Sequence, residues 1–186
     1  VITVVSGLPR SGTSLMMQLM AAAGRKALTD SRRAADEDNP LGYFEFEKAT
    51  GLAKDKSWLP QARGKVVKIV AQLLPHLPRN EHYNVIFMER NLNEVIASQK
   101  TMLARQRRRG AELDERKLRE VYTAQLQRVR AQLAKRPEMR VLRIHFAELL
   151  ANPIAGVDQL ARFLGEPFDQ VAAAKAVHPE LRRQKF

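Results

Sequence analysis

The first fourteen residues contain a pattern that can bind phosphate. An apolar run, Val-Ile-Thr-Val-Val, leads into a turn that carries Gly7 and Gly12, and the hydroxyl residues Thr13 and Ser14 follow at once. This spacing is the frame of a P-loop, in which successive backbone N–H groups surround an anion and the next helix adds the positive end of its dipole. The segment therefore predicts a site for a phosphorylated nucleotide.

Thr13 stands where nucleoside triphosphatases carry the lysine of this motif. That lysine contacts the β- and γ-phosphates, so its absence disfavours a triphosphate ligand. Arg10 and Ser11, inside the loop, are the residues that can replace its donors. A P-loop kinase or nucleoside triphosphatase that uses ATP and Mg²⁺ stays open as an alternative, with Glu89 at a strand end as its candidate magnesium ligand.

A second segment joins a buried strand to an arginine. Residues 85–88 are apolar, Arg90 follows Glu89, and Ser98 lies about two turns into a predicted helix that Asn93 is expected to cap. Ligands of open α/β sheets bind at the carboxyl edge of the strands, where Arg90 would present two parallel donors. Arg90 and Ser98 therefore predict contacts to a phosphate, and the alternative for Arg90 is an ion pair with a nearby carboxylate.

Both segments require a sheet whose strands end at one edge. Apolar runs predict parallel strands at about 1–6, 65–70, 84–88 and 140–145, separated by helical stretches. The alternation predicts an α/β fold of three layers, α/β/α, around a central, mostly parallel sheet, as in P-loop nucleotide hydrolases. We interpret the whole chain as one domain, because 186 residues with 45% apolar content can bury one core.

Apolar spacing also places the helices. The first is expected to follow Gly12 and to end near Gly24, and a long helix is expected over about 112–134 with one apolar stripe. That stripe has two interpretations, a cover on the sheet or the seam of a homodimer. Residues 30–42 predict a loop, and 146–164 predict a helix with one interruption.

The formal charge of +12 is unevenly distributed, with 13 Lys and Arg against 5 Asp and Glu between Arg105 and Arg143. This basic stretch is interpreted either as a helix face exposed to solvent or as a surface that attracts an acidic partner. No aromatic residue lies between Arg105 and Arg109, so nucleic-acid binding is not expected.

Other features of the composition limit the expected cellular location and the kinds of chemistry that are possible. The chain has no cysteine, which excludes thiolate chemistry and makes a reducing cytoplasm the expected location. The apolar stretch 15–24 is too short to cross a bilayer, so no stable membrane insertion is expected. The four histidines show no metal-ligand spacing, and no metal site is predicted; His145, at a strand end, is interpreted as structural.

Taken together, the two segments resemble a known family. Residues 7–14, Gly-Leu-Pro-Arg-Ser-Gly-Thr-Ser, resemble the 5′-phosphosulfate loop of sulfotransferases that use 3′-phosphoadenosine 5′-phosphosulfate (PAPS). Arg90 with Ser98 is similar to the arginine and serine that hold the donor's 3′-phosphate there, and residues 39–45 and 178–182 look like segments of bacterial members. The resemblance implies sulfuryl transfer from PAPS to a hydroxyl or amine acceptor, with adenosine 3′,5′-bisphosphate (PAP) as product and no metal.

The resemblance also implies roles for single residues. Arg10 would contact the bridging and non-bridging oxygens of the phosphosulfate and stabilise the charge that develops on the leaving phosphate. The N–H groups from Ser11 to Ser14 would surround the 5′-phosphate. Arg182, in a late basic segment, would fold over the 3′-phosphate, and a free basic tail is its alternative.

The catalytic base is less clearly marked by the resemblance. Lys68 resembles the lysine in the second strand of many sulfotransferases, near the transferring group, but Val70 stands where cytosolic members carry histidine. A carboxylate must then take the acceptor's proton, and Glu45 is the first candidate because it lies just beyond the long loop, beside two aromatic residues. The alternative for Glu45 is a structural carboxylate at a helix start. Its rivals as base are Glu47, Asp36 and Glu37.

Two acceptor classes stay open. A small phenolic or aliphatic alcohol would fit an apolar pocket formed by Tyr43, Phe44, Trp58 and Leu59, although buried aromatic residues are more often part of the core. An acidic peptide or polysaccharide would instead fit the arginine cluster that begins at Arg105. A catalytically inactive nucleotide-binding adaptor is the second alternative function, because Val70 replaces the usual base.

Overall fold

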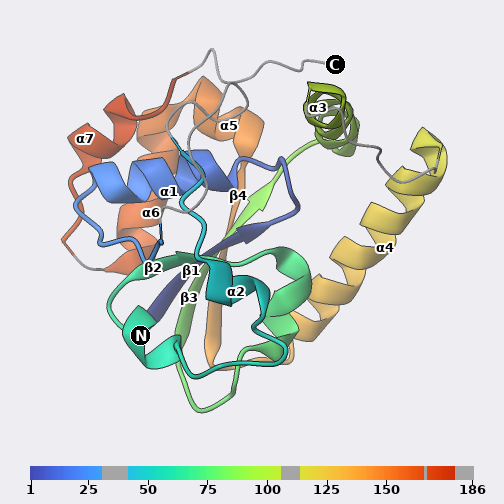
Figure 1. Ribbon diagram of the computed structural model, residues 1–186. Helices are drawn as coiled ribbons and strands as arrows, with labels where there is room; N and C mark the ends of the chain where they lie inside the picture. The colour runs from blue at the N-terminus through green and yellow to red at the C-terminus, as the bar shows by residue number, and fades with distance from the viewer. Residues whose placement is uncertain (31–41, 106–113, 166, 179–186) are drawn as a thin grey trace.

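The computed structural model describes residues 1–30, 42–105, 114–165 and 167–178, and within them four parallel strands form one sheet (Figure 1). The strands are β1 (Ile2–Gly7), β2 (Val66–Lys68), β3 (Tyr83–Glu89) and β4 (Met139–His145), in the order β2-β1-β3-β4. The two inner strands, β1 and β3, are buried nearly throughout, which explains why they appear in the sequence as continuous apolar runs. The predicted parallel α/β sheet is confirmed.

One face of the sheet is covered by four helices, which Figure 1 shows grouped together: α1 (Thr13–Ala22), α5 (Phe146–Ala151), α6 (Pro153–Leu164) and α7 (Gln170–Lys175). Met16, Leu149 and Leu160 pack here against Val5 and Ile86 of the inner strands. The predicted interruption of the last long helical stretch is the boundary between α5 and α6, where the Asn152 side chain accepts a hydrogen bond from Ala155 N and caps α6.

The opposite face is covered by short helical turns and by one end of a long helix. These elements are α2 (Glu47–Thr50), η1 (Leu59–Ala62), η2 (Ala71–His76) and the C-terminal part of α4 (Glu115–Leu133). Their side chains pack against Val4 and Phe87 of the inner strands, so the molecule has the expected three layers. β2 is shorter than the predicted 65–70, because the chain leaves the sheet after Lys68 to form η2.

α3 (Leu92–Arg105) and α4 together form an arm beside the sheet (Figure 1). Val129 and Leu133 of α4 are buried on the sheet, whereas Val121 in its N-terminal half is 50% exposed. The stripe therefore covers the sheet over its C-terminal half only. The predicted start at 112 lies outside the described residues, and Asp114 caps the described helix through Lys117 N. Within the described helices, we find no segment with the length and hydropathy of a membrane span.

The predicted cap of α3 is wrong by two residues. The helix begins at Leu92, and the side-chain oxygen of Asn91 accepts a hydrogen bond from Asn93 N at 2.8 Å. The Val95 N–H already bonds to Asn91 O, so the first helical turn starts at Asn91. Asn91 thus occupies the capping position, and Asn93 is an exposed residue of the first turn.

Replacing the cap tests this assignment. We expect Asn91→Ala to lower the free energy of unfolding by about 1 kcal/mol, because an N–H of the first turn loses its acceptor. Asn93→Ala, a matched change at an exposed position, should stay within about 0.5 kcal/mol of the parent. Urea denaturation of both variants gives the comparison. Equal losses, or a larger loss for Asn93→Ala, would contradict the assignment.

Candidate functional site

The loop at residues 7–14 requires glycine at both of its spacing positions. A Cβ added to Gly7 would lie 2.4 Å from Ser11 Oγ and 2.7 Å from the carbonyl oxygen of Met88. A Cβ on Gly12 would lie 2.4 Å from the ring of Phe146. Both glycines also have positive φ, +151° and +99°. The spacing read from the sequence is therefore imposed by close contacts with β3 and with the start of α5.

The loop leaves hydrogen-bond donors available at the start of α1. No side chain among the described residues caps this helix at Gly12, and its first turn holds no acidic residue. The first N–H groups of a helix have no acceptor within the helix. Ser11 Oγ is buried and has no hydrogen-bond partner in the described part of the chain. An unpaired buried hydroxyl beside an uncapped helix start is the arrangement expected of an anion site.

Arg10 connects this loop to the second predicted segment. Its Nε donates to Ser98 Oγ at 2.9 Å, although the two residues are 88 positions apart, and its Nη1 lies 3.9 Å from Met102 Sδ. Arg10 also has φ +67°, a left-handed conformation that costs a non-glycine residue about 1–3 kcal/mol and recurs at ligand sites. In this structure the guanidinium therefore lies against α3.

Arg90 takes the ion-pair alternative. Its Nε donates to Glu94 Oε2 at 2.9 Å, and the two side chains are only 7% and 2% exposed. Its Nη1 donates to the carbonyl oxygen of Arg10 at 3.1 Å, and its guanidinium carbon lies 4.4 Å from the centroid of the Phe146 ring. Desolvation offsets much of the Coulomb attraction in such a buried pair. The ion pair with Glu94 and the bond to the Arg10 carbonyl hold Arg90 against the loop. Arg10 in turn contacts Ser98, so Arg90, Arg10 and Ser98 lie in one connected group.

Lys68 lies at the end of β2 and contacts both α1 and the segment before α2. Its Nζ donates to Ser14 Oγ and to the carbonyl oxygen of Tyr43, each at 3.0 Å. Glu45 Oε1 is 3.9 Å from the same nitrogen, and the Glu45 side chain is 40% exposed. Lys68, Ser14 and Glu45 thus form one cluster at the carboxyl edge of the sheet, with the carboxylate on its solvent side.

The alternative that places Glu45 at a helix start is wrong. The helix α2 begins at Glu47, with Phe46 as its cap residue, so the acidic residue of the first turn is Glu47. The Glu47 N–H is held by Asp30 Oδ2 at 2.7 Å, and the Glu47 side chain is exposed. The other rivals, Asp36 and Glu37, lie outside the described residues, as do Arg182 and the arginines at 107–109.

Trp58 and Leu59 do not line an acceptor pocket. Both are fully buried in the core on the α2 side of the sheet, and the Phe46 ring packs edge-on against Trp58 with centroids 5.3 Å apart. Tyr43 is also buried, whereas Phe44 is half-buried and has φ +51°. The pocket interpretation is therefore wrong for Trp58 and Leu59, and the alternative, burial in the core, is confirmed for both.

Sequence reasoning missed two residues of the site. Glu94 carried a usable signal, since it stands four positions after Arg90 on a predicted helix and such residues are neighbours. Phe146, under the Arg90 guanidinium and against Gly12, carried only a weak one: it follows the fourth strand, so the fold places it at the same edge. Its contact with Gly12 spans most of the chain and has no local pattern.

One of three comparisons with known proteins shows the family. The sequence profile of the Sulfotransferase family matches residues 67–170, which is more than half of the chain and includes Lys68, Arg90 and Ser98 but not the loop at 7–14. Comparison with functionally curated proteins gives no match.

Two solved structures share the fold. The sulfotransferase domain of the olefin synthase from Synechococcus PCC 7002 is 16% identical with a TM-score of 0.59, and the alignment covers 98% of this chain and 78% of that one. The sulfotransferase domain from the curacin biosynthetic pathway is 20% identical with a TM-score of 0.53, covering 100% and 78%. At these identities the likeness shows the fold alone, whereas the family profile covers most of the chain between β2 and α7. The chain belongs to the sulfotransferase family.

Proposed function

We propose that this protein transfers a sulfuryl group from PAPS to a hydroxyl or amine acceptor. The observation that carries the proposal is the 2.9 Å hydrogen bond between Arg10 and Ser98. It joins a loop built for one phosphate to a helix that presents a second anion contact, at one edge of one sheet. A nucleotide with phosphate groups on both the 3′ and the 5′ oxygen of its ribose, such as PAPS, matches two such sites better than one with a chain of phosphates at the 5′ oxygen alone.

The chain offers donors for both ends of PAPS. The uncapped start of α1 and Ser11 Oγ suit the 5′-phosphate, since both lack partners in the described residues. Arg90 and Ser98 suit the 3′-phosphate. Arg10 belongs to the loop and its side chain reaches Ser98. Its guanidinium can therefore donate hydrogen bonds to PAPS between the 5′-phosphate contacts and the 3′-phosphate contacts. PAPS itself supplies the sulfuryl group and a phosphate that leaves with the S–O bond electrons.

Glu45 is the proposed base and Lys68 the proposed electrophilic partner. Lys68 is fixed by Ser14 and by the Tyr43 carbonyl, so its ammonium is oriented before a substrate arrives. Glu45 lies 3.9 Å from that ammonium and is half-exposed, where an acceptor hydroxyl can reach it from solvent. Glu45 would take the hydroxyl proton as the acceptor oxygen attacks sulfur.

The kinase alternative has less support. Its candidate magnesium ligand, Glu89, lies on the α4 side of β3 and faces two arginines, with Arg130 Nη2 at 2.8 Å and Arg143 Nε at 3.8 Å; His145 Nε2 lies 3.4 Å away. The two arginine charges beside this carboxylate repel a divalent cation and so oppose the binding of Mg²⁺. An inactive adaptor would keep the donor site and lack a working base.

Ligand-dependent melting separates the donor classes. PAP should raise the melting temperature without magnesium, because a ligand that binds only the native state stabilises it. ATP with magnesium should give a much smaller shift at equal concentration. Differential scanning fluorimetry measures both, and the reverse ranking would exclude PAPS as the donor.

The 3′-phosphate contact can be isolated with two variants. Arg90→Ala alone would leave Glu94 buried without its cation, so the first variant is the double change Arg90→Ala with Glu94→Gln. The second variant, Ser98→Ala, is milder because it keeps the ion pair. Each should weaken PAP by about 10-fold to 100-fold in isothermal titration, since a charge-assisted contact is lost. Adenosine 5′-phosphate, which has no 3′-phosphate, should bind all forms alike; equal losses for both nucleotides would remove Arg90 and Ser98 from this role.

Glu45→Gln tests the base. With PAPS as donor and a panel of phenols and alcohols as acceptors, this variant should form PAP about 100-fold or more slowly than the parent, which is the usual contribution of a general base. PAP affinity should be unchanged. The matched control is Glu47→Gln, an exposed carboxylate at the start of α2, which should keep full turnover. Retained turnover in Glu45→Gln would transfer the role to another carboxylate.

A further inference from the structure

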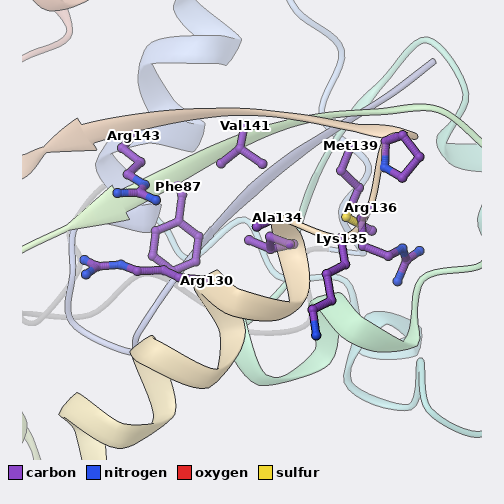
Figure 2. Close-up of a pocket in the computed structure, with 10 residues that line it drawn as sticks. Phe87, Arg130, Ala134, Lys135, Arg136, Met139, Val141 and Arg143 are labelled. Carbon is purple, nitrogen blue, oxygen red and sulfur yellow. The ribbon is translucent and has the colours of Figure 1, made fainter.

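A groove runs between the C-terminal end of α4 and β4, outside the candidate donor site (Figure 2). Its volume is about 530 Å³, within the range of about 300–1,000 Å³ that is usual for small-molecule sites. Apolar side chains form much of its lining: Phe87, Leu133, Met139 and Val141. The groove could therefore accept a compact apolar body.

Cationic side chains line the same groove. Figure 2 shows Arg130 and Arg143 beside Phe87 at one end, with Lys135 and Arg136 at the other. Arg136 already has partners within the protein, since it is buried, pairs with Glu138 and donates to the carbonyl oxygens of Pro75 and Leu77. The charge available to a ligand therefore comes from Arg130, Arg143 and Lys135.

These three charges are incompletely balanced within the described residues. Glu89 is the carboxylate near both arginines, 2.8 Å from Arg130 Nη2 but 3.8 Å from Arg143 Nε, which is beyond hydrogen-bond length. Lys135 has no carboxylate partner among the described residues. One carboxylate for three cations leaves the groove with a net positive charge.

Arg130 gives a second sign of a missing partner. Its Nε is buried and has no hydrogen-bond acceptor in the described part of the chain. A buried guanidinium N–H without an acceptor is unfavourable by about 1–3 kcal/mol and often marks a bound water or ion. The Arg130 side chain as a whole is 40% exposed, so an anion in the groove would balance the net charge at the exposed part of its guanidinium.

The groove is separate from the candidate donor site. Successive side chains of a strand point to opposite faces, so Glu89 lies on the α4 face while Arg90 lies over Phe146 on the other. An anion beside Arg143 would therefore lie on the opposite side of the sheet from Phe146 and α1. Its binding does not depend on the proposed function.

We propose that this groove binds an organic anion, with its carboxylate, sulfate or phosphate group at Arg130 and Arg143 and its apolar body on Val141 and Met139. The two guanidinium groups supply the anion contact, and the apolar lining supplies area that an inorganic ion cannot use. The ligand class is a small amphiphilic anion.

Isothermal titration with octyl sulfate tests the proposal, in the presence of saturating PAP to occupy the candidate donor site. We expect one octyl sulfate per chain, and binding about tenfold or more tighter than that of octyl glucoside, which has the same tail and no charge. Inorganic sulfate, which has no tail, should also bind at least about tenfold more weakly.

Variants locate the binding. Arg143→Gln should weaken octyl sulfate about tenfold, and Val141→Glu, which adds a negative charge to the lining, should remove detectable binding. Arg116→Gln is the matched control for the loss of one arginine charge, because Arg116 lies on α4 with Arg130, is 83% exposed and does not line the groove. Equal binding of octyl glucoside, displacement of octyl sulfate by PAP, or unchanged affinity in Arg143→Gln would each overturn the proposal.

Discussion

The parallel pairing of β1 with β3 positions the rest of the candidate site. Its register aligns Gly7 with Met88, so the loop leaves β1 at the level where β3 delivers Glu89 and Arg90. The same closeness leaves no room for a side chain on Gly7, which faces the Met88 carbonyl. A shift of one residue in this register would turn Arg90 to the opposite face of the sheet and separate it from the loop. The candidate phosphate loop and the proposed second anion contact thus both depend on one strand pairing.

Several groups at this edge are arranged at a cost to stability. Arg10 holds a left-handed backbone, Arg90 and Glu94 are buried as ions, and Ser11 has a buried hydroxyl without a partner in the described residues. Each is unfavourable alone by about 1–3 kcal/mol or more. The apolar cores on both faces of the sheet, around Phe87 and Met16, support them. Such features are expected where donors are oriented before the ligand binds.

Local patterns predicted the elements, and contacts distant in sequence decided the details. The four strands and the first loop could be read from apolar runs and glycine spacing, because each is specified within a few residues. The cap of α3 was misplaced since Asn91 and Asn93 are equally good capping residues by type. The sequence left pocket and core open for Trp58, which lies in the core, and it carried only a weak signal for Phe146 and none for its contact with Gly12. These outcomes depend on packing between elements far apart in the chain.

We propose that one nucleotide spans two anion contacts at a single edge of the sheet. A crystal structure of the complex with PAP is the sharpest test of this proposal. We expect the 5′-phosphate at the N–H groups that begin α1, and the 3′-phosphate within hydrogen-bond distance of both Arg90 and Ser98. A 3′-phosphate out of reach of Arg90 and Ser98, or a nucleotide bound away from the loop at 7–14, would contradict it.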